Sequence, residues 1–274
     1  AFTVAGIALQ PSEFVKIIFV FFVAARLHQS VELKQVAVTT AVAAAHVVVL
    51  VCSKDLGGAL IFFVVYLAML YVATAKPLYF IGGLAGGSLA AGVAYKLFSH
   101  VRTRVVAWQD PLSVIDKEGY QVCQSLFAIG TGGWFGVGLT CGMPEKIPVV
   151  EQDFVFSAIS EEMGGIVAIC LILVCMSCFL MFLNIAMQLK DSFYKLVALG
   201  LGTMYGFQVF LTIGGVIKFI PSTGVTLPLV SYGGSSLFST VIIFAVIQGF
   251  YILRETEERG AADAKKQKNG YLRK

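Results

Sequence analysis

The amino-acid sequence predicts an all-α protein, a polytopic bundle of transmembrane helices with a large extracytoplasmic loop. The first observation is composition: 58% of the 274 residues are hydrophobic and only 13% are charged. A soluble domain has about 25% charged and about 45–50% apolar residues. A soluble globule must cover its surface with polar groups, so this excess indicates that lipid covers much of the surface. The second observation is that the apolar residues gather in runs of membrane-spanning length.

Seven apolar runs approach the roughly 20 residues that a helix needs to cross a bilayer. They are, to within a few residues, Pro11–Leu27, Val36–Cys52, Leu56–Ala73, Pro77–Phe98, Glu162–Met187, Phe193–Ile217 and Ser236–Leu253. Pro11 and Pro77 suit the first turn of a helix, where a backbone N–H needs no partner within the helix. The glycines of Gly82–Gly87 predict a small-residue face, which could pack inside the bundle or against a partner.

Two segments interrupt the apolar runs, and we expect function to concentrate there because loops on a rigid scaffold carry most chemistry. The longer one runs from Ser99 to Glu161, and the shorter one from Lys218 to Ser235. The chain opens in the middle of this pattern at Ala1, which suggests a fragment without its true N-terminus.

The distribution of lysine and arginine predicts the orientation. Basic residues favour the side that holds the tail Glu255–Lys274, so the positive-inside rule places that tail in the cytoplasm and both loops outside. Residues 1–254 are then the membrane domain. The charged tail is expected to be disordered because it has too few apolar residues to bury.

Charge and cysteine patterns exclude other classes of function. The formal net charge is +4, and the basic residues are scattered apart from the tail, so no nucleic-acid partner is expected. The six cysteines show no spacing typical of a metal site. Cys123 and Cys141 share the long loop, where a disulfide between them is one alternative and two free thiols the other.

Charged residues near the helix starts form the first candidate group. Glu13 and Lys16 are three residues apart and share a helix face. They predict either an interfacial pair that anchors the helix end or a polar wall of a substrate cavity. Asp55 precedes the third apolar run, where a cap on the helix amides explains it and a role in a site stays open.

The long loop offers positive charge and exposed backbone. Arg102 and Arg104 could bind phosphate, or could simply lie at headgroup level. The glycine run Gly130–Gly138 lets the backbone approach a ligand closely. It contains Gly-Val-Gly, but no strand precedes it, so a dinucleotide site is excluded.

Carboxylates cluster at the end of the long loop. Asp153 precedes an apolar stretch at the outer membrane edge, where desolvation raises the pKa of an acid and suits it to proton transfer. A helix N-cap is the alternative role for Asp153. Glu161 and Glu162 follow at the start of a span, where they could support a polar cavity or oppose the helix dipole.

The segment Pro221–Ser236 is the least regular of the chain. Two prolines, three glycines and many hydroxyls cannot form a regular helix, and irregular backbone at membrane depth survives only when buried or beside a watery cavity. We therefore expect it to line the site. Its candidate binding residues, together with the nearby cation, are Lys218, Ser231, Gly233, Gly234 and Ser235. Gly233 and Gly234 are predicted to need positive φ or close approach, so that a bulky side chain would clash.

Five motifs, in order along the chain, resemble the SEDS family of shape, elongation, division and sporulation proteins. They are Pro-Ser-Glu-Phe-Val-Lys at 11–16, Asp-Leu-Gly at 55–57, Gly-Tyr-Gln at 119–121, Asp-Phe-Val-Phe at 153–156 with Glu161-Glu162-Met163-Gly164, and Pro221–Ser236. The resemblance covers about Gly6 to Leu253. One departure is that Ser53-Lys54 stands before Asp55, where the family usually has an acid and a proline.

The resemblance implies a peptidoglycan glycosyltransferase of the bacterial cytoplasmic membrane. Its substrate would be lipid II, the undecaprenyl-diphosphate-linked disaccharide peptide, polymerised into glycan strands outside the membrane for division, elongation or sporulation. A class B penicillin-binding protein and membrane lipid are the implied partners. The catalytic acid falls on Asp153. The family has about ten spans, so about three would precede Ala1 in a complete chain.

The chemistry of that reaction fits the candidate residues. A carboxylate can deprotonate the attacking sugar hydroxyl. Arg102, Arg104, Lys218 or a bound divalent cation could stabilise the diphosphate leaving group. No organic cofactor is implied. Two other functions stay open at this stage: a lipid II flippase, whose substrate charges would lie near the midplane, and a membrane scaffold of the division machinery.

Overall fold

The structure is a computed structural model that describes residues 2–4 and 7–271. A short antiparallel hairpin of β1 (Phe2–Val4) and β2 (Ile7–Leu9) precedes the helices, and the sequence did not predict it. The helices are α1 (Pro11–Gln29), α2 (Leu33–Cys52), α3 (Leu56–Thr74), α4 (Pro77–Leu97), α5 (Ser99–Gln109), α6 (Tyr120–Gly132), the 3₁₀ helix η1 (Pro144–Lys146), α7 (Val155–Gln188), α8 (Ser192–Val216) and α9 (Gly234–Tyr271).

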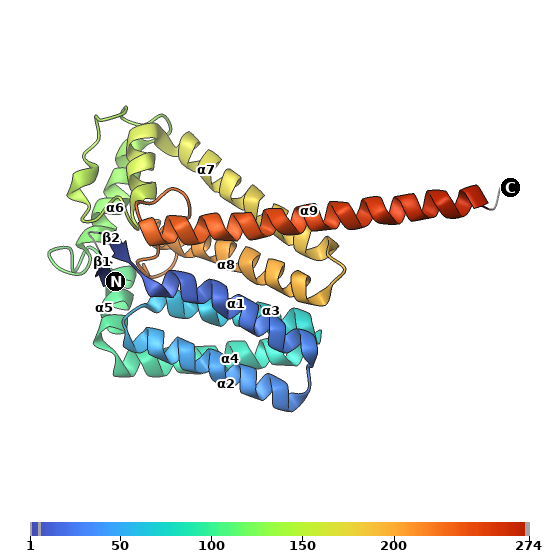
Figure 1. The fold of residues 1–274 in the computed structure, drawn as a ribbon. Coiled ribbons are helices and arrows are strands. Elements are labelled where there is room, and N and C mark those ends of the chain that lie inside the picture. The colour runs from blue at the N-terminus through green and yellow to red at the C-terminus, as the bar shows by residue number, and fades with distance from the viewer. Residues whose placement is uncertain (1, 5–6, 272–274) are drawn as a thin grey trace.

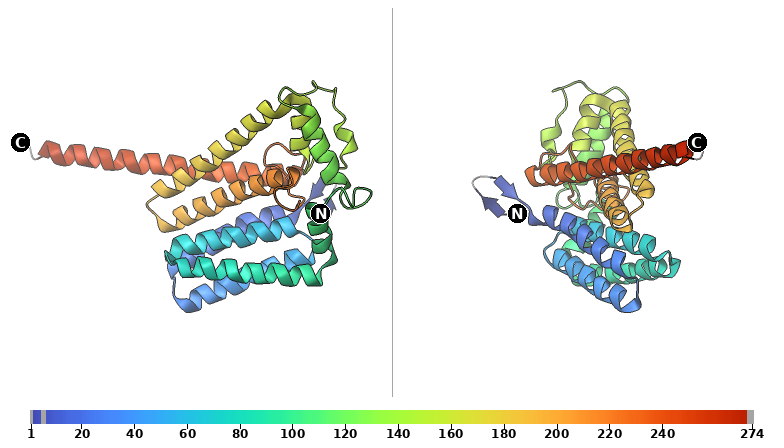
Figure 2. Two further views of the ribbon diagram at one scale, coloured as in Figure 1. Left: turned by 180° about the vertical axis from the view of Figure 1, so that it is seen from behind. Right: turned by 45° about the vertical axis from the view of Figure 1, so that its right-hand side comes forward.

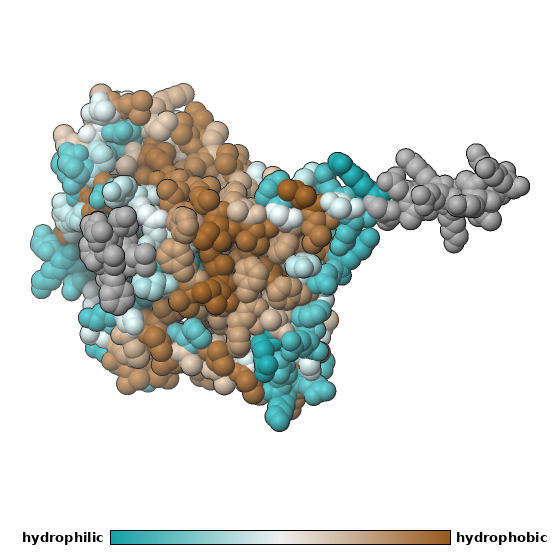
Figure 3. Space-filling model, viewed as in Figure 1, coloured by the Kyte–Doolittle hydropathy of each residue, from teal (hydrophilic) through white to brown (hydrophobic). Residues whose placement is uncertain are grey.

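The long helices lie side by side in one bundle (Figure 1). Within the described residues, six helices are long and apolar enough to cross a membrane: α2, α3, α4, α7, α8 and the Gly234–Glu257 part of α9. The seventh predicted span is the 19-residue α1, which carries Glu13, Lys16 and Arg26 and so falls outside that apolar set. Figure 3 shows apolar side chains over the middle of one face and polar ones at its two ends.

Helix α8 is the centre of the bundle. It packs against α1, α3, α7 and α9, and 72% of its most apolar stretch is buried inside the protein. Helix α4 lies at the edge, next to α3 and α5, and has no buried residue (Figure 2). The glycines of α4 have different surroundings. A Cβ at Gly83 or Gly87 would overlap side chains of α3, whereas a Cβ at Gly82 or Gly86 would meet open space.

The predicted long loop is largely folded, because it contains α5, α6 and η1. Helix α7 begins at Val155, seven residues before the predicted start, and is broken at Gly164, where φ is 86°. The backbone N–H groups of Val137 and Gly138 donate to the carbonyls of Glu161 and Glu162 at 2.9 and 3.0 Å. The glycine-rich loop therefore satisfies carbonyls that the break removes from the helix ladder.

Two further expectations differ from the structure. The tail predicted to be disordered continues α9 as a helix to Tyr271, supported by an ion pair of 3.4 Å between Arg259 and Glu255 one turn apart. Cys123 is buried and Cys141 is exposed, and both are free thiols, so the disulfide alternative is wrong for this structure.

Candidate active site

A cavity of about 270 Å³ lies at the end of the bundle where α8 ends and α9 begins; we call it the Asp153 cavity. Its walls come from α5, α6, the end of α8, the start of the Lys218–Ser235 segment and the residues before α7. The lining residues are Thr103, Arg104, Ala107, Trp108, Glu118, Gln121, Val122, Asp153, Phe154, Gly215, Lys218, Ile220, Ser222 and Gly224. The fold thus brings three predicted residues, Asp153, Arg104 and Lys218, to one place.

Asp153 is half-buried on the cavity wall and does not cap a helix. The N-cap of α7 is Phe154, which makes no side-chain capping bond. Burial raises the pKa of the Asp153 carboxyl above its ordinary value, while its own backbone N–H and the positive charge of Arg104 act in the opposite direction. The carboxyl therefore has no capping role, and burial is the main influence on its pKa.

Arg104 holds its guanidinium in the same cavity. Its Nη1 donates to the carbonyl oxygen of Ser222 at 2.8 Å, which fixes the side chain on the irregular segment. Burial lowers the pKa of Arg104, and the negative charges of Asp153 and Asp55 oppose that shift. The group keeps its charge, because the ordinary pKa of arginine lies far above neutral pH.

Arg102 is not part of this cavity. It lies two residues before Arg104 on α5, about 200° around the helix, so the two side chains leave on opposite faces. Arg102 is exposed, and its Nη2 donates to the carbonyl of Lys96 at 3.1 Å. The predicted role of Arg102 in substrate binding has no support in the geometry.

Gly224 has the backbone conformation that the sequence predicted for Gly233 and Gly234. Its φ is 72°, and a Cβ there would lie 3.7 Å from both Asp153 Oδ2 and Arg104 Nη2. Gly233 and Gly234 do not have positive φ, and a Cβ at Gly234 would meet nothing within 4 Å. The predicted positive φ is therefore wrong for Gly233 and Gly234, whereas Gly224 has it, and a Cβ at Gly224 would make only ordinary contacts.

Lys218 lies just after α8 in a left-handed conformation, with φ of 60°. Its carbonyl accepts a hydrogen bond of 3.1 Å from Trp108 Nε1, which links the irregular segment to α5. The half-buried Lys218 side chain lines the cavity together with Glu118 and Gln121. Sequence reasoning missed Trp108, Glu118 and Gln121 as site residues, although Gln121 belongs to the Gly-Tyr-Gln motif.

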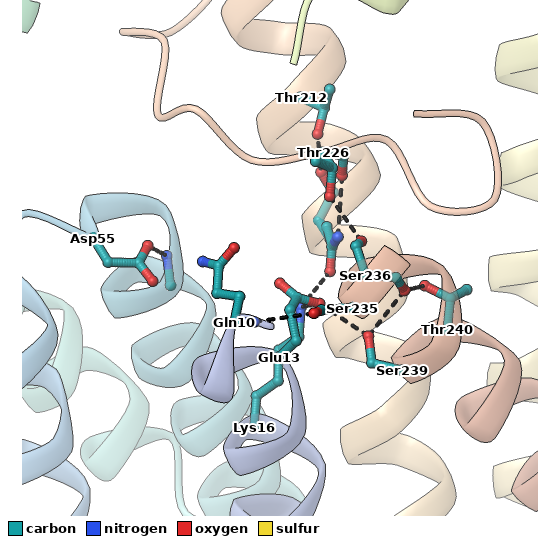
Figure 4. Close-up of polar contacts among 12 residues, drawn as sticks. Gln10, Glu13, Lys16, Asp55, Thr212, Thr226, Ser235, Ser236, Ser239 and Thr240 are labelled. Carbon is teal, nitrogen blue, oxygen red and sulfur yellow. Dashed lines mark hydrogen bonds and ion pairs between the residues drawn. The ribbon is translucent and has the colours of Figure 1, made fainter. Parts of the chain in front are cut away.

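A buried polar network lies beside the cavity. Glu13 and Lys16 form an ion pair of 2.8 Å inside the bundle, where the two residues are 9% and 4% exposed. Lys16 Nζ also donates to Gln208 Oε1 of α8 at 2.8 Å, and Ser239 Oγ of α9 donates to Glu13 Oε2 at 2.9 Å (Figure 4). The pair joins three helices, so it is not an interfacial anchor.

The same network holds the irregular segment in place. Gln208 Nε2 donates to the carbonyl of Thr226 at 3.0 Å, and Thr226 Oγ1 donates to Ser236 Oγ at 2.7 Å. Thr212 Oγ1 donates to the carbonyl of Val225 at 2.9 Å. These bonds satisfy backbone groups that a helix would otherwise pair internally.

Asp55 connects the network to the cavity. Its Oδ1 accepts from the backbone N–H of Gly58 at 2.8 Å, so it caps α3 as one of the two predicted roles. Asp55, Glu13 and Lys16 also line a small cavity of about 40 Å³ that shares Gly224 with the Asp153 cavity. These three residues therefore lie next to the Asp153 cavity, and their role in supporting it stays a prediction.

Two serines that are predicted to bind substrate accept hydrogen bonds from backbone N–H groups. Ser231 Oγ accepts from the N–H of Leu227 at 2.8 Å, inside a local turn. Ser235 Oγ accepts from the N–H of Gln10 at 3.0 Å and so joins the start of α9 to the start of α1. Neither lines the Asp153 cavity, and their predicted substrate contacts stay predictions.

Glu161 and Glu162 are absent from the walls of the Asp153 cavity. Glu161 lines a separate cavity under the glycine-rich loop. Within residues 2–4 and 7–271, no group of three or more His, Cys, Asp or Glu side chains could hold a metal ion. The carboxylates on the Asp153 cavity wall are Asp153 and Glu118, so a divalent cation there stays a prediction.

A family model described as "Cell cycle protein" and named for FtsW, RodA and SpoVE matches residues 2–256. The peptidoglycan glycosyltransferase RodA of Mycobacterium tuberculosis (strain ATCC 25618 / H37Rv) is 36% identical over 258 residues, which are 88% of this chain and 55% of the relative. The stage V sporulation protein E of Bacillus subtilis (strain 168) is 32% identical, over 89% of this chain and 68% of the relative.

Solved structures agree with the fold. A chain from the structure titled "Structural coordination of polymerization and crosslinking by a peptidoglycan synthase complex" superposes with a TM-score of 0.73 at 25% identity, over 91% of this chain and 72% of that one. The rod shape determining protein RodA of Thermus thermophilus gives a TM-score of 0.62 at 24% identity, over 90% and 67%. This chain spans about half the length of the mycobacterial relatives that it matches.

Proposed function

We propose an activity for this chain on the premise that it belongs to the FtsW/RodA/SpoVE family of cell cycle proteins, whose model matches residues 2–256. The activity is polymerisation of lipid II, a disaccharide peptide on a lipid diphosphate, into peptidoglycan glycan strands. The name of the mycobacterial relative, peptidoglycan glycosyltransferase, supports it. The single observation that carries it here is that a half-buried carboxyl, Asp153, shares a cavity with the cations Arg104 and Lys218.

Asp153 is proposed as the general base. A sugar hydroxyl of one substrate loses its proton to the Asp153 carboxylate while its oxygen attacks the anomeric carbon of a second substrate. A new glycosidic C–O bond forms, and the bond between the anomeric carbon and the lipid diphosphate breaks. A single displacement of this kind inverts the anomeric carbon and needs no covalent enzyme intermediate.

Arg104 and Lys218 are proposed to stabilise the leaving diphosphate. Negative charge grows on the phosphate oxygens as the bond breaks, and cations that are already held in place stabilise that charge without reorganising. Arg104 is already fixed by Ser222, so it is preorganised. Lys218 lies where α8 ends, on the segment that also places Gly224.

The cavity is proposed to face the outside of a bacterial cytoplasmic membrane. It lies at the opposite end of the bundle from the basic tail that forms the last part of α9, which supports this orientation. A class B penicillin-binding protein is the proposed partner, because a similar chain was solved within a peptidoglycan synthase complex of polymerisation and crosslinking.

A flippase is the second candidate, because the buried Glu13–Lys16 network places charge inside the bundle. The two functions separate in one experiment on the full-length protein with its partner. Purified protein in detergent, where no membrane exists to cross, should convert lipid II into glycan strands resolved by gel electrophoresis. Absence of strands in detergent, together with lipid II movement in vesicles, would establish the flippase instead.

A further inference from the structure

A second cavity lies under the glycine-rich loop that joins α6 to α7, and we call it the Glu161 cavity. Its volume is about 370 Å³. Apolar side chains such as Phe127, Met143 and Ile147 form much of the wall, and Gln124 and Thr131 of α6 add hydrogen-bonding groups. The two cavities share no lining residue, so the Glu161 cavity is a separate space.

Glu161 is the acidic residue of this cavity, and it is 6% exposed. Its Oε2 is buried and has no hydrogen-bond partner. A Cβ built on Gly142 would lie 3.1 Å from Glu161 Oε2, so the loop backbone covers the carboxyl closely. The Glu161 backbone carbonyl is held by the N–H of Val137 at 2.9 Å, which fixes the residue under the loop.

An ionised carboxylate in such a place needs a partner. Leaving a buried acceptor unsatisfied costs a large part of its desolvation free energy, and a buried charge is tolerated when it is paired. Glu13, the other buried glutamate among the residues whose burial is described, follows this rule with Lys16 and Ser239. Glu161 Oε2 does not follow this rule, because it has no hydrogen-bond partner among the described residues. Glu161 lies on the wall of a cavity that has room for a ligand.

The walls select the class of ligand. A divalent cation prefers six or more oxygen ligands, whereas much of this wall is apolar. An anion is excluded by the carboxylate itself. A primary ammonium on an alkyl chain fits both features, because its N–H groups can bond Glu161, Gln124 and Thr131 while its carbons contact Phe127 and Met143.

We propose that the Glu161 cavity binds a primary alkyl ammonium group, separately from the chemistry at Asp153. We assign this ammonium group to the peptide of the lipid-linked substrate or product, which carries amino groups. That assignment rests on the proposed function. Helix α6 gives the geometry, since Gln121 faces the Asp153 cavity and Gln124 faces the Glu161 cavity, about 5 Å further along the helix. A peptide attached to a sugar at Asp153 would thus be held by its amine.

The first arm of the test uses a simple amine and needs no polymerisation. Radiolabelled n-butylamine, protonated at pH 7.5, should bind saturably to the purified full-length protein. Glu161→Gln should weaken binding at least about 10-fold, because a charge-assisted hydrogen bond is lost. Asp153→Asn should bind the amine as the wild type does, which separates this site from the proposed catalytic one. Equal binding by wild type and Glu161→Gln would overturn the proposal.

Lys146 supplies the matched control, because it is an exposed residue that lines the same cavity and carries an ammonium group of its own. Lys146→Met should leave amine binding unchanged or tighten it. If the amine binds only to Lys146→Met and not to the wild type, Lys146 is the partner of Glu161 and the proposal fails. Glu161→Gln is nearly isosteric, and its melting temperature and elution volume show that the variant is folded.

The second arm identifies the bearer of the amine. Binding of lipid II with a free peptide amine is compared with binding of lipid II whose amine is acetylated. Acetylation should weaken binding to the wild type by about the factor that Glu161→Gln costs, and should have no effect in Glu161→Gln. An equal affinity of the wild type for both lipids, with n-butylamine still bound, would overturn the assignment to the peptide and leave a site for a free amine.

Discussion

The Glu13–Lys16 ion pair and the oppositely charged residues Asp153 and Arg104 line two cavities that share Gly224, and each set combines a carboxylate with a cation in a different way. Glu13 and Lys16 are closed into hydrogen bonds with Gln208 and Ser239 inside the bundle. The Asp153 and Arg104 side chains line a cavity of about 270 Å³ and keep surface for a ligand. A charge pair with every partner satisfied fixes the fold, whereas a charge pair beside a cavity can bind and react.

The largest effect on stability is expected from opening the closed pair. Lys16→Met removes the cation and leaves Glu13 buried, which should lower the free energy of unfolding by about 3–5 kcal/mol. The double variant Glu13→Gln with Lys16→Met should recover most of that loss, since no charge stays unpaired. Thermal unfolding in detergent measures both. A single variant as stable as the wild type would show that the network does not hold α1, α8 and α9 together.

The largest effect on rate among the cations is expected at Arg104. Arg104→Met should lower polymerisation by about 10²–10³-fold, the usual loss for a fixed charge that stabilises a leaving group. Arg102→Met is the matched control on the opposite face of α5 and should keep near-wild-type rates. Strand synthesis from lipid II measures both variants. Equal losses in the two would mean that the arginines act through the membrane surface and not through the cavity.

These pairs also show what the sequence could predict. Apolar runs located seven helices to within a few residues except at the start of α7 and the end of α9, because a long apolar run reports burial in lipid directly. Arg102 and Arg104 could not be separated, because the sequence segment was expected to be a loop and the helix α5 decides which side each faces. Glu161 was placed with Asp153 because they are close in sequence, yet the break at Gly164 and the loop above it give Glu161 its own cavity.

The glycines give the next prediction. Gly224→Ala should destabilise the protein by about 1–2 kcal/mol, because φ of 72° is costly for a residue with a Cβ. It should also lower the polymerisation rate, since the new methyl enters the space between Asp153 and Arg104. Gly234→Ala, at an open position on α9, should change neither. Melting temperatures and strand synthesis of the two variants test this, and a harmful Gly234→Ala beside a neutral Gly224→Ala would reverse the assignment.

The smallest expected effect is a shift in the pH profile. A general base must be ionised, so activity falls as pH drops through the pKa of Asp153. Burial raises that pKa, so the acid limb of kcat/KM should lie above the ordinary range of aspartate near 3.9. Arg104 lowers the pKa, so Arg104→Met should move the limb to higher pH in its residual activity. A limb that moves to lower pH would contradict the electrostatic link between the two groups.

The central claim is that Asp153 takes the proton while Asp55 holds the fold, and one paired measurement tests it. Asp153→Asn and Asp55→Asn are made in the full-length protein with its partner, and initial rates of lipid II polymerisation are measured. Asparagine caps a helix about as well as aspartate, so Asp55→Asn should stay folded and retain much of its activity. Asp153→Asn should fold, bind lipid II and lose about 10²–10⁴-fold in rate. Near-normal polymerisation by Asp153→Asn would contradict the claim.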